Sequence, residues 1–322
     1  MIDFPLFIVG SYRAGTTLLR LVLSCHEDIY ISDETGFIAE VGRRLNEFGD
    51  LSQPRHLKRL YKEIVRFLIK SQWKDIPSYD YVVRHIRAPS YPELIRVVCT
   101  YGSPKLSVLV WGDNTPRYVY EIAYLKQLFP NARFLVMVRD GRDVYASVKQ
   151  TPFGKGLEPE AVALEWTHRL FHGLAAHRYL GPQDVMLLKY EKFVQAPVET
   201  LTEIIAWLGV HWPGADVFLR FYETADAQHM SLTMPHHANL VRPISPQGVG
   251  RFRRDLSKKE ILCLEKLMAP GLLAFGYELV NPVRPNGGHL VHLRRLCWSR
   301  LAQKYGALTN SLKQIIQNFL QP

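Results

Sequence analysis

Short apolar runs alternate with amphipathic helical patterns along most of the chain, and this alternation constrains the fold more than any other feature of the sequence. Apolar runs bounded by turn residues indicate buried strands. Strands that alternate with helices favour an α/β fold, a parallel sheet with helices on both faces. The expected strands are 4–9, 29–32, 107–111, 133–138 and 185–188, and the expected helices are 16–25, 36–48, 55–72, 91–101, 115–129, 141–149, 158–180 and 197–208.

Composition and charge narrow the classes of protein that remain. Hydrophobic residues make up 47% of the 322 residues, which excludes wholesale disorder. The formal net charge of +10 suggests an anionic ligand, substrate or surface. The apolar run at the N-terminus is too short for a signal peptide or a membrane span. Four cysteines without a CxxC pair argue against a zinc site or a disulfide framework, so we expect a reducing, cytoplasmic location.

A glycine-bounded turn, G-S-Y-R-A-G-T-T-L-L at residues 10–19, follows the first expected strand and precedes a helix. Free amides at a helix start receive phosphate, and hydroxyls and a basic side chain inside the loop add to that binding. Thr16, Thr17 and Arg13 supply these groups here. A Walker A motif needs a lysine after the second glycine, and Thr16 occupies that position. This disfavours a nucleotide kinase, while a turn that binds no ligand stays open as the alternative.

A second candidate anion site lies at the end of the strand expected at 133–138. Arg139 ends that strand, and Ser147 follows two turns into the next helix. Ligands of parallel sheets bind beyond the carboxyl ends of the strands, so Arg139 and the loop at 10–15 should share one rim. The alternative is a surface arginine beside an unrelated serine on a helix face.

Four segments, in order along the chain, together resemble the sulfotransferases that use 3′-phosphoadenosine 5′-phosphosulfate (PAPS). They are the loop at 12–19, V-R-D-G-R-D-V-Y-A-S at 138–147, L-L-K-Y-E-K-F-V-Q-A-P at 187–197 and G-R-F-R-R-D-L-S at 250–257. The resemblance runs from about residue 4 to 277. Its details, including D-E-T at 33–35 and R-P-I at 242–244, are most similar to tyrosylprotein and related bacterial sulfotransferases.

The resemblance implies a P-loop-like parallel sheet with helical insertions, a PAPS donor with PAP as product, and two anion sockets. Arg13 with residues 15–17 would hold the 5′-phosphosulfate, and Arg139, Ser147 and Arg251 would hold the 3′-phosphate. Sulfuryl transfer would proceed by in-line displacement without a metal. The implied donor-binding residues are Arg13, Ala14, Gly15, Thr16, Thr17, Leu18, Arg139, Ser147, Tyr190, Arg251 and Arg253.

Glu34 aligns with the glutamate of the family's Glu-Thr pair, so the resemblance implies that it is the general base, with Arg13 as the other catalytic residue. A carboxylate beside Arg13 would have a lowered pKa and would be ionised at neutral pH. The alternative role for Glu34 is a carboxylate at the start of the helix expected at 36–48.

The chain departs from the family pattern at two positions. Ala14 replaces a usual serine, and Asn114 stands where many relatives have a lysine that contacts the sulfuryl group. Asn114 is therefore a candidate substrate contact that donates a hydrogen bond without charge. Trp166, His168 and His236 are further candidates for the acceptor side. These departures keep a catalytically degenerate PAP-binding module open, beside the P-loop phosphotransferase.

Residues 1–280 are expected to form a single sulfotransferase domain, and residues 281–322 a basic helical extension. The extension is expected to pack on the domain, and a peripheral contact with an anionic membrane is the alternative. The expected partners are the nucleotide donor and an acceptor hydroxyl or amine on a small molecule, a sugar or a tyrosine peptide. No aromatic-basic pattern typical of nucleic-acid binding is present.

Overall fold

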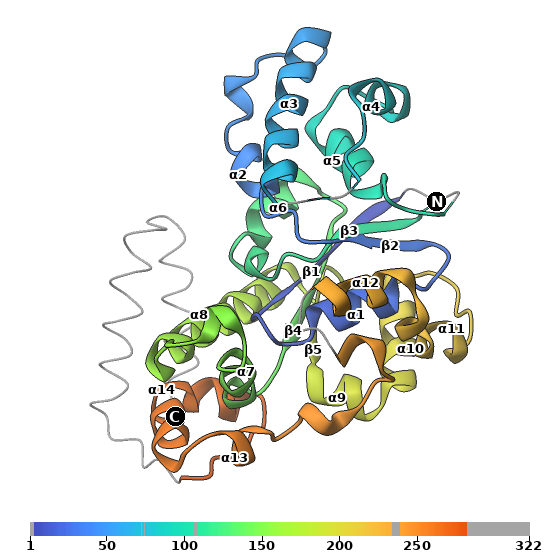
Figure 1. Cartoon of the computed structure of the whole chain (residues 1–322). Helices are drawn as coiled ribbons and strands as arrows, with labels where there is room; N and C mark the ends of the chain where they lie inside the picture. Colours follow the sequence, from blue (N-terminus) through green and yellow to red (C-terminus); the bar gives the residue numbers. More distant parts are fainter. Residues whose placement is uncertain (1–2, 72, 74, 106–107, 234–238, 282–322) are drawn as a thin grey trace.

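Five parallel strands form one sheet in the order β2-β3-β1-β4-β5, in a computed structural model that describes residues 3–71, 73, 75–105, 108–233 and 239–281 (Figure 1). All four strand pairs are parallel, as the alternating pattern predicts. The strands are β1 Phe4–Gly10, β2 Ile29–Ser32, β3 Val110–Asp113, β4 Arg133–Val138 and β5 Val185–Lys189.

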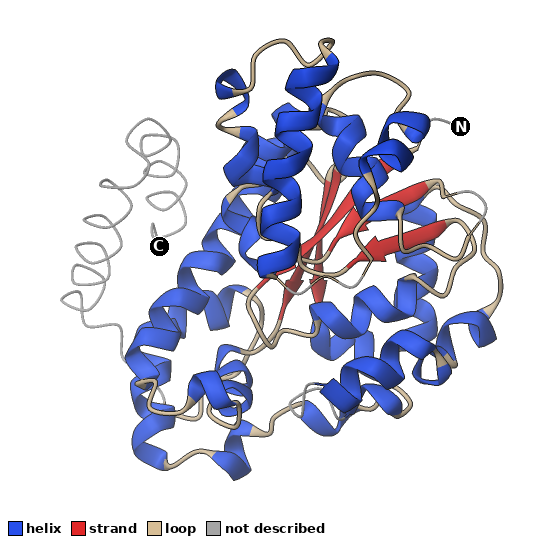
Figure 2. Ribbon diagram, turned by 45° about the horizontal axis from the view of Figure 1, so that its top comes forward, coloured by secondary structure: helices blue, strands red, loops and turns tan. Residues whose placement is uncertain are grey.

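Helices cover both faces of this sheet (Figure 2). Side chains alternate along β1, so that Leu6 and Ile8 enter one apolar cluster while Phe7 and Val9 enter the other. The first cluster also contains side chains of α1 Thr16–Leu23, α9 Tyr190–Gln195, α10 Pro197–Leu208, α11 Ala215–Leu219 and α12 Ala225–Thr233. The second contains side chains of α2 Ile38–Gly42, α3 Pro54–Lys70, α4 Tyr79–His85, α5 Tyr91–Thr100, α6 Ile122–Leu128, α7 Gly141–Val148, α8 Pro159–Leu180, α13 Phe252–Asp255 and α14 Lys258–Ala274.

The structure corrects four of the expected elements. The helix expected at 36–48 is divided into α2 and a 3-10 helix, Leu45–Glu47, and the helix expected at 115–129 into a 3-10 helix, Pro116–Tyr120, and α6. The strand expected at 107–111 is Val110–Asp113, because Gly112 continues the pairing where a Cβ would lie 1.9 Å from the Leu6 carbonyl oxygen. Residues 228–255, whose prolines and glycines predict a long irregular loop, contain the end of α12 and the short helix α13.

A buried ionic network joins α7 to α14. Arg142 on α7 has 2% of its side chain exposed and pairs with Asp140 at 2.7 Å and with Glu265 of α14. Glu265 also accepts hydrogen bonds from the backbone N–H groups of Val280 and Asn281, at 2.8 and 2.9 Å. The network therefore holds the last described residues against α7 and α14.

The predicted extension, 281–322, lies outside the described residues except for its first residue, so its packing stays a prediction. Within the described part of the chain, no helix combines the length and apolar character that crossing a bilayer requires.

Candidate functional site

The loop between β1 and α1 contains three residues with unusual backbone conformations. Gly10 has φ of 143°, and a Cβ there would lie 2.4 Å from the Met137 carbonyl oxygen on β4. Arg13 has φ of 61°, which is rare for a residue with a side chain, and Gly15 has φ of 99°. Helix α1 begins at Thr16 without a side-chain cap. The amides of its first turn are thus available to an anion at the carboxyl end of the sheet.

Arg139 is held in place directly after β4. Its carbonyl oxygen accepts a hydrogen bond from Trp166 Nε1 at 3.0 Å. Its guanidinium donates to the Arg13 carbonyl oxygen at 2.9 Å and to the Gly248 carbonyl oxygen at 2.6 Å. The same group lies over the Tyr190 ring, 4.2 Å from its centroid. Arg139 Nε is buried and has no hydrogen-bond partner in the described part of the structure, so one donor is left for a ligand.

Three guanidinium groups lie close together in this region. Arg13 Nε donates to Ser147 Oγ at 3.1 Å. This bond brings Arg13, predicted to hold the 5′-phosphosulfate, to a residue predicted to hold the 3′-phosphate. Burial, together with the nearby charges of Arg139 and Arg251, lowers the pKa of Arg13 to about 10. Arg251 is paired with Asp255 at 2.7 Å. Like charges crowded in this way favour an anionic ligand that carries more than one negative charge.

These groups line a cavity of about 200 Å³, and the two predicted sockets lie within it as one site. Four arginines and no carboxylate are found among its described lining residues. The ring of Tyr190 closes over the loop, because a Cβ on Gly15 would lie 2.6 Å from it. The lining consists of Arg13, Gly15, Thr16, Thr17, Leu18, Arg139, Ser147, Tyr190, Asn239, Leu240, Arg242, Pro243, Ile244, Ser245, Gln247, Gly248 and Arg251.

Nine of the eleven predicted donor-binding residues line this cavity, and Ala14 and Arg253 do not. Ala14 is fully buried in the loop, while Arg253 is exposed beside the ring of Phe252. Sequence reasoning missed the lining contributed by the segment 239–248. The R-P-I motif beginning at Arg242 was the one signal for it, and nothing local showed that this loop returns to the sheet.

The loop that carries Arg251 is fixed by a buried carboxylate. Asp143 on α7 accepts hydrogen bonds from the backbone N–H groups of Gly250 at 2.7 Å and Phe252 at 2.9 Å. Burial raises the pKa of Asp143 to about 6. This carboxylate therefore positions the backbone on either side of Arg251, although its own side chain does not line the cavity.

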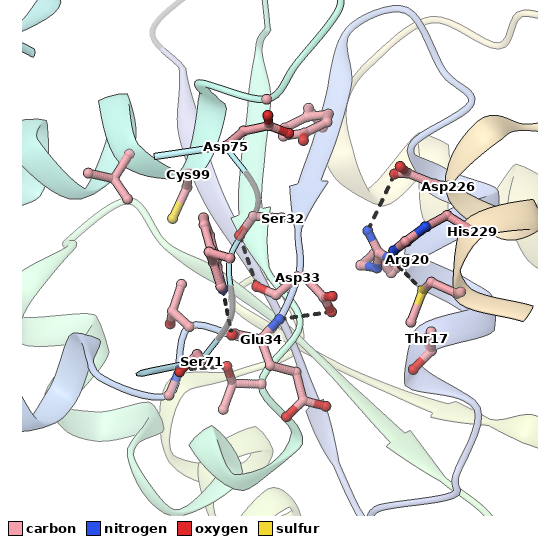
Figure 3. Close-up of a pocket in the computed structure, with 18 of the residues that line it drawn as sticks. Thr17, Arg20, Ser32, Asp33, Glu34, Ser71, Asp75, Cys99, Asp226 and His229 are labelled. Carbon is pink, nitrogen blue, oxygen red and sulfur yellow. Dashed lines mark hydrogen bonds and ion pairs between the residues drawn. The ribbon is translucent and has the colours of Figure 1, made fainter. Parts of the chain in front are cut away.

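A second cavity, of about 800 Å³, adjoins the first, and Thr17 lines both (Figure 3). Its wall comes from α1, β2 and the turn after it, the loop after α3, α5, the segments around the 3-10 helices Pro116–Tyr120 and Pro152–Gly154, and α12. The lining residues are Thr17, Arg20, Tyr30, Ser32, Asp33, Glu34, Thr35, Gly36, Ser71, Trp73, Asp75, Val98, Cys99, Gly102, Thr115, Arg117, Phe153, Asp226, His229 and Met230.

Glu34 lies in this second cavity, accessible from it but surrounded by protein (Figure 3). Its N–H donates to Asp33 Oδ1 at 3.0 Å, and its carbonyl oxygen accepts from Trp73 Nε1 at 3.1 Å. Desolvation, together with the negative charges of Asp33 and Asp113, raises the pKa of Glu34 to about 7. The expected lowering by Arg13 is wrong, because two carboxylates and burial outweigh the cations nearby.

Asp113, at the end of β3, organises the turn beside Glu34. Its two oxygens accept from the N–H groups of Thr35 at 2.9 Å and Thr115 at 2.8 Å. Burial raises the pKa of Asp113 to about 6. Asn114 is completely buried next to it, lines neither cavity, and has no hydrogen-bond partner for its side-chain amide within the described structure. The structure thus does not bring Asn114 to the cavity surface.

The other candidate acceptor residues lie elsewhere. Trp166 is buried behind Arg139, where its ring also contacts Gly141 and Gly271, so its role is structural. His168, two residues further along α8, lines neither cavity. His236 lies outside the described residues.

His26, Asp28 and His211 form a cluster whose side-chain atoms lie within 4.8 Å of one another. Both ring nitrogens of His26 are already engaged by the backbone. Nδ1 accepts from the Asp28 N–H at 3.0 Å, and Nε2 lies 2.8 Å from the His211 carbonyl oxygen. A metal at this cluster would have to break one of these bonds, so the cluster is better explained as a structural link.

The parallel sheet, the glycine-bounded loop and the arginine-lined cavity define an α/β protein that binds a phosphorylated ligand. Comparison with known proteins identifies its family. Residues 5–214 match the profile of the Sulfotransferase family. The chain belongs to this family, whose members are enzymes that transfer a sulfuryl group from PAPS.

Relatives of known name and known structure agree with this assignment. The chain is 24% identical over 287 residues to the protein-tyrosine sulfotransferase of Drosophila melanogaster, covering 87% of this chain but only 53% of that protein. It is 26% identical over 294 residues to human protein-tyrosine sulfotransferase 1, covering 89% and 73%.

Two solved structures share the fold. The sulfotransferase domain of the Synechococcus PCC 7002 olefin synthase superposes with a TM-score of 0.54 at 21% identity, covering 86% of this chain and 96% of that one. The sulfotransferase domain from the curacin biosynthetic pathway gives 0.55 at 19% identity, covering 86% and 99%.

Proposed function

We propose that this chain transfers the sulfuryl group of PAPS to a phenolic hydroxyl. One observation carries the proposal. A cavity lined by four arginines shares its lining residue Thr17 with a second cavity that contains a carboxyl group with a pKa near 7. A donor with phosphates at both ends fits the first cavity, and an acceptor that must lose a proton fits the second. The relatives named as protein-tyrosine sulfotransferases support a phenolic acceptor.

The first cavity suits adenosine 3′,5′-bisphosphate chemically. Arg139 and Arg251 would bind one phosphate beside Ser147, and the uncapped start of α1 with Thr16 and Thr17 would bind the other. Arg13 belongs to the loop that precedes α1, and its Nε donates to Ser147 Oγ. The unpartnered Nε of Arg139 and the absence of any carboxylate among the described lining residues both favour a polyanion. Tyr190, whose ring lies under the Arg139 guanidinium and lines the cavity, would contact the adenosine.

PAPS supplies an activated sulfuryl group when it is bound. Thr17, which lines both cavities, would lie where the donor and the acceptor meet. Glu34 would accept the proton of the acceptor hydroxyl as the oxygen attacks sulfur. Arg13 and the amides of α1 would stabilise the negative charge left on the bisphosphate product as its bond to sulfur breaks. The chain would also accelerate the reaction by aligning the donor and the acceptor.

The test is transfer of labelled sulfate from PAPS to 4-ethylphenol by the full chain and by two variants. Arg139→Gln should lose most donor affinity, because it removes a charge and two of the described hydrogen bonds. Arg178→Gln, an exposed arginine of α8 that lines neither cavity, is the matched control and should behave as the wild type. Equal donor affinity in the wild type and Arg139→Gln, with the fold intact by circular dichroism, would overturn the donor site.

A further inference from the structure

The two adjoining cavities carry opposite charge. Four arginines and no carboxylate are among the described lining residues of the donor cavity. The larger cavity is lined by four carboxylates against two arginines, in the part that the structure describes. The carboxylates are Asp33, Glu34, Asp75 and Asp226, and the arginines are Arg20 and Arg117.

One of the two arginines that line the larger cavity, Arg20, is already paired. Arg20 is buried on α1, with Nη1 3.7 Å from Asp226 Oδ2 and Nη2 donating to the sulfur of Met230 at 2.9 Å. Asp33 and Asp75 are exposed, and neither has an ion-pair partner among the described residues. Their charges therefore face the cavity without an ion pair, and Arg117 is the other arginine of the described lining.

Two titratable groups in the wall sense this negative charge. Burial raises the pKa of Tyr30 to about 12, with Asp226 and Asp75 among the contributing charges. The pKa of Glu34 is raised by burial and then by Asp33 and Asp113. In both groups burial is the largest cause of the shift, the carboxylates add to it, and Arg20 opposes it. The carboxylates that line the cavity would repel an anionic acceptor.

Aromatic side chains complete the wall. Tyr30, Trp73 and Phe153 all line the cavity, and Phe153 is 54% exposed there. The indole N–H of Trp73 is bonded to the Glu34 carbonyl oxygen, which fixes an aromatic ring close to the candidate base. Aromatic faces bind planar rings and attract cations, so they complement the carboxylates.

From the cavity, its charge and its aromatic wall we infer that the acceptor is a phenol that carries a positively charged ammonium group. The inference rests on the proposed sulfuryl transfer to a phenol and adds the charge of the acceptor. The phenol lies toward Thr17 and Glu34, and the ammonium group lies toward Asp33 and Asp75. An acidic tyrosine peptide is excluded by the same carboxylates.

Three phenols that differ mainly in the charge of the side chain test this inference. They are tyramine, which is cationic, 4-ethylphenol, which is neutral, and 3-(4-hydroxyphenyl)propanoate, which is anionic. Binding of each to the full chain saturated with PAP is measured by calorimetry, alongside kcat/KM with PAPS. A charge on the ligand at roughly 6 Å from one carboxylate, across a partly hydrated cavity, changes affinity about tenfold. We therefore expect tyramine to bind about tenfold more tightly than 4-ethylphenol, and 4-ethylphenol about tenfold more tightly than the anionic phenol.

Asp75→Asn should reduce the preference for tyramine over the anionic phenol at least about threefold, because it removes one unpaired charge. Asp80→Asn, on α4 and outside the cavity lining, removes an equal charge and should leave the preference unchanged. Equal binding of the three phenols, tighter binding of the anionic one, or binding of none at 10 mM would overturn the inference. Loss of PAP binding, in contrast, would refute the donor site itself.

Discussion

The raised pKa of Glu34 predicts an unusual pH dependence for the transfer reaction. A base must be ionised to accept the acceptor proton. With a pKa of about 7, the ionised fraction of Glu34 rises from about one tenth at pH 6 to about nine tenths at pH 8. The expected rise in kcat/KM over this range is therefore about ninefold to tenfold. An unperturbed glutamate would already be almost fully ionised at pH 6, and the rate would stay flat.

The assay is kcat/KM for 4-ethylphenol at saturating PAPS between pH 5.5 and 9. Glu34→Gln should lose about 10²- to 10⁴-fold in turnover at every pH while PAP still binds. Asp33→Asn, which removes the nearest negative charge but keeps an acceptor for the Glu34 N–H, should move the acid limb to lower pH. A limb that stays near pH 4.5, or full turnover in Glu34→Gln, would refute the assignment of the base.

The same pKa shift has a consequence for stability. The folded-state pKa of Glu34 lies above its unfolded value, so the fold favours the protonated form. The charged form therefore costs the folded state stability progressively from pH 4.5 to 7 and fully above pH 7. Glu34→Gln should raise Tm at pH 8 and leave it unchanged at pH 4, as measured by differential scanning calorimetry. An equal change in Tm at both pH values would contradict the shift.

Two further substitutions test the donor loop and the ionic network. Gly15→Ala places a Cβ 2.6 Å from the Tyr190 ring at a φ of 99°, and should weaken PAP binding at least about tenfold by calorimetry. Gly156→Ala is its control, because it has a φ of 83° and nothing within 4 Å, and PAP binding should not change. Arg142→Met leaves the buried Glu265 without its cation and should destabilise the chain by about 3–5 kcal/mol in urea unfolding. A loss below about 1 kcal/mol would show that the network contributes little.

The sequence was informative where local pattern and chemistry coincide. The apolar runs that became β1 and β4 are strands buried on both faces, and such strands show clearly as continuous hydrophobic segments. The loop carrying Arg13 and the strand end at Arg139 could be placed on one rim, because the ends of parallel strands meet there. The strand expected at 107–111 ends too early, because a glycine after an apolar run is typical of a strand end. Gly112 instead continues the strand, since the neighbouring strand leaves no room for a Cβ there.

Contacts between distant segments could not be read from the sequence. The pKa of Glu34 depends on Asp113, which lies on another strand and has no local signature. Trp166 was an acceptor candidate as an aromatic residue on the long helix expected at 158–180, but its ring is buried and its indole N–H donates to the Arg139 carbonyl oxygen. The cavity wall contributed by residues 239–248 depends on a loop whose path is set by tertiary contacts with Arg139 and Asp143.

Calorimetry of the full chain with PAP and with 5′-AMP, which lacks the 3′-phosphate, tests most directly whether the arginine cavity binds phosphate at both ends of one nucleotide. We predict that PAP binds at least about a hundredfold more tightly, since two charge-assisted hydrogen bonds at roughly 1.5 kcal/mol each would be lost with the 3′-phosphate. Raising the salt concentration should reduce this difference. Equal affinity for the two nucleotides, or no binding of PAP at millimolar concentration, would contradict the account.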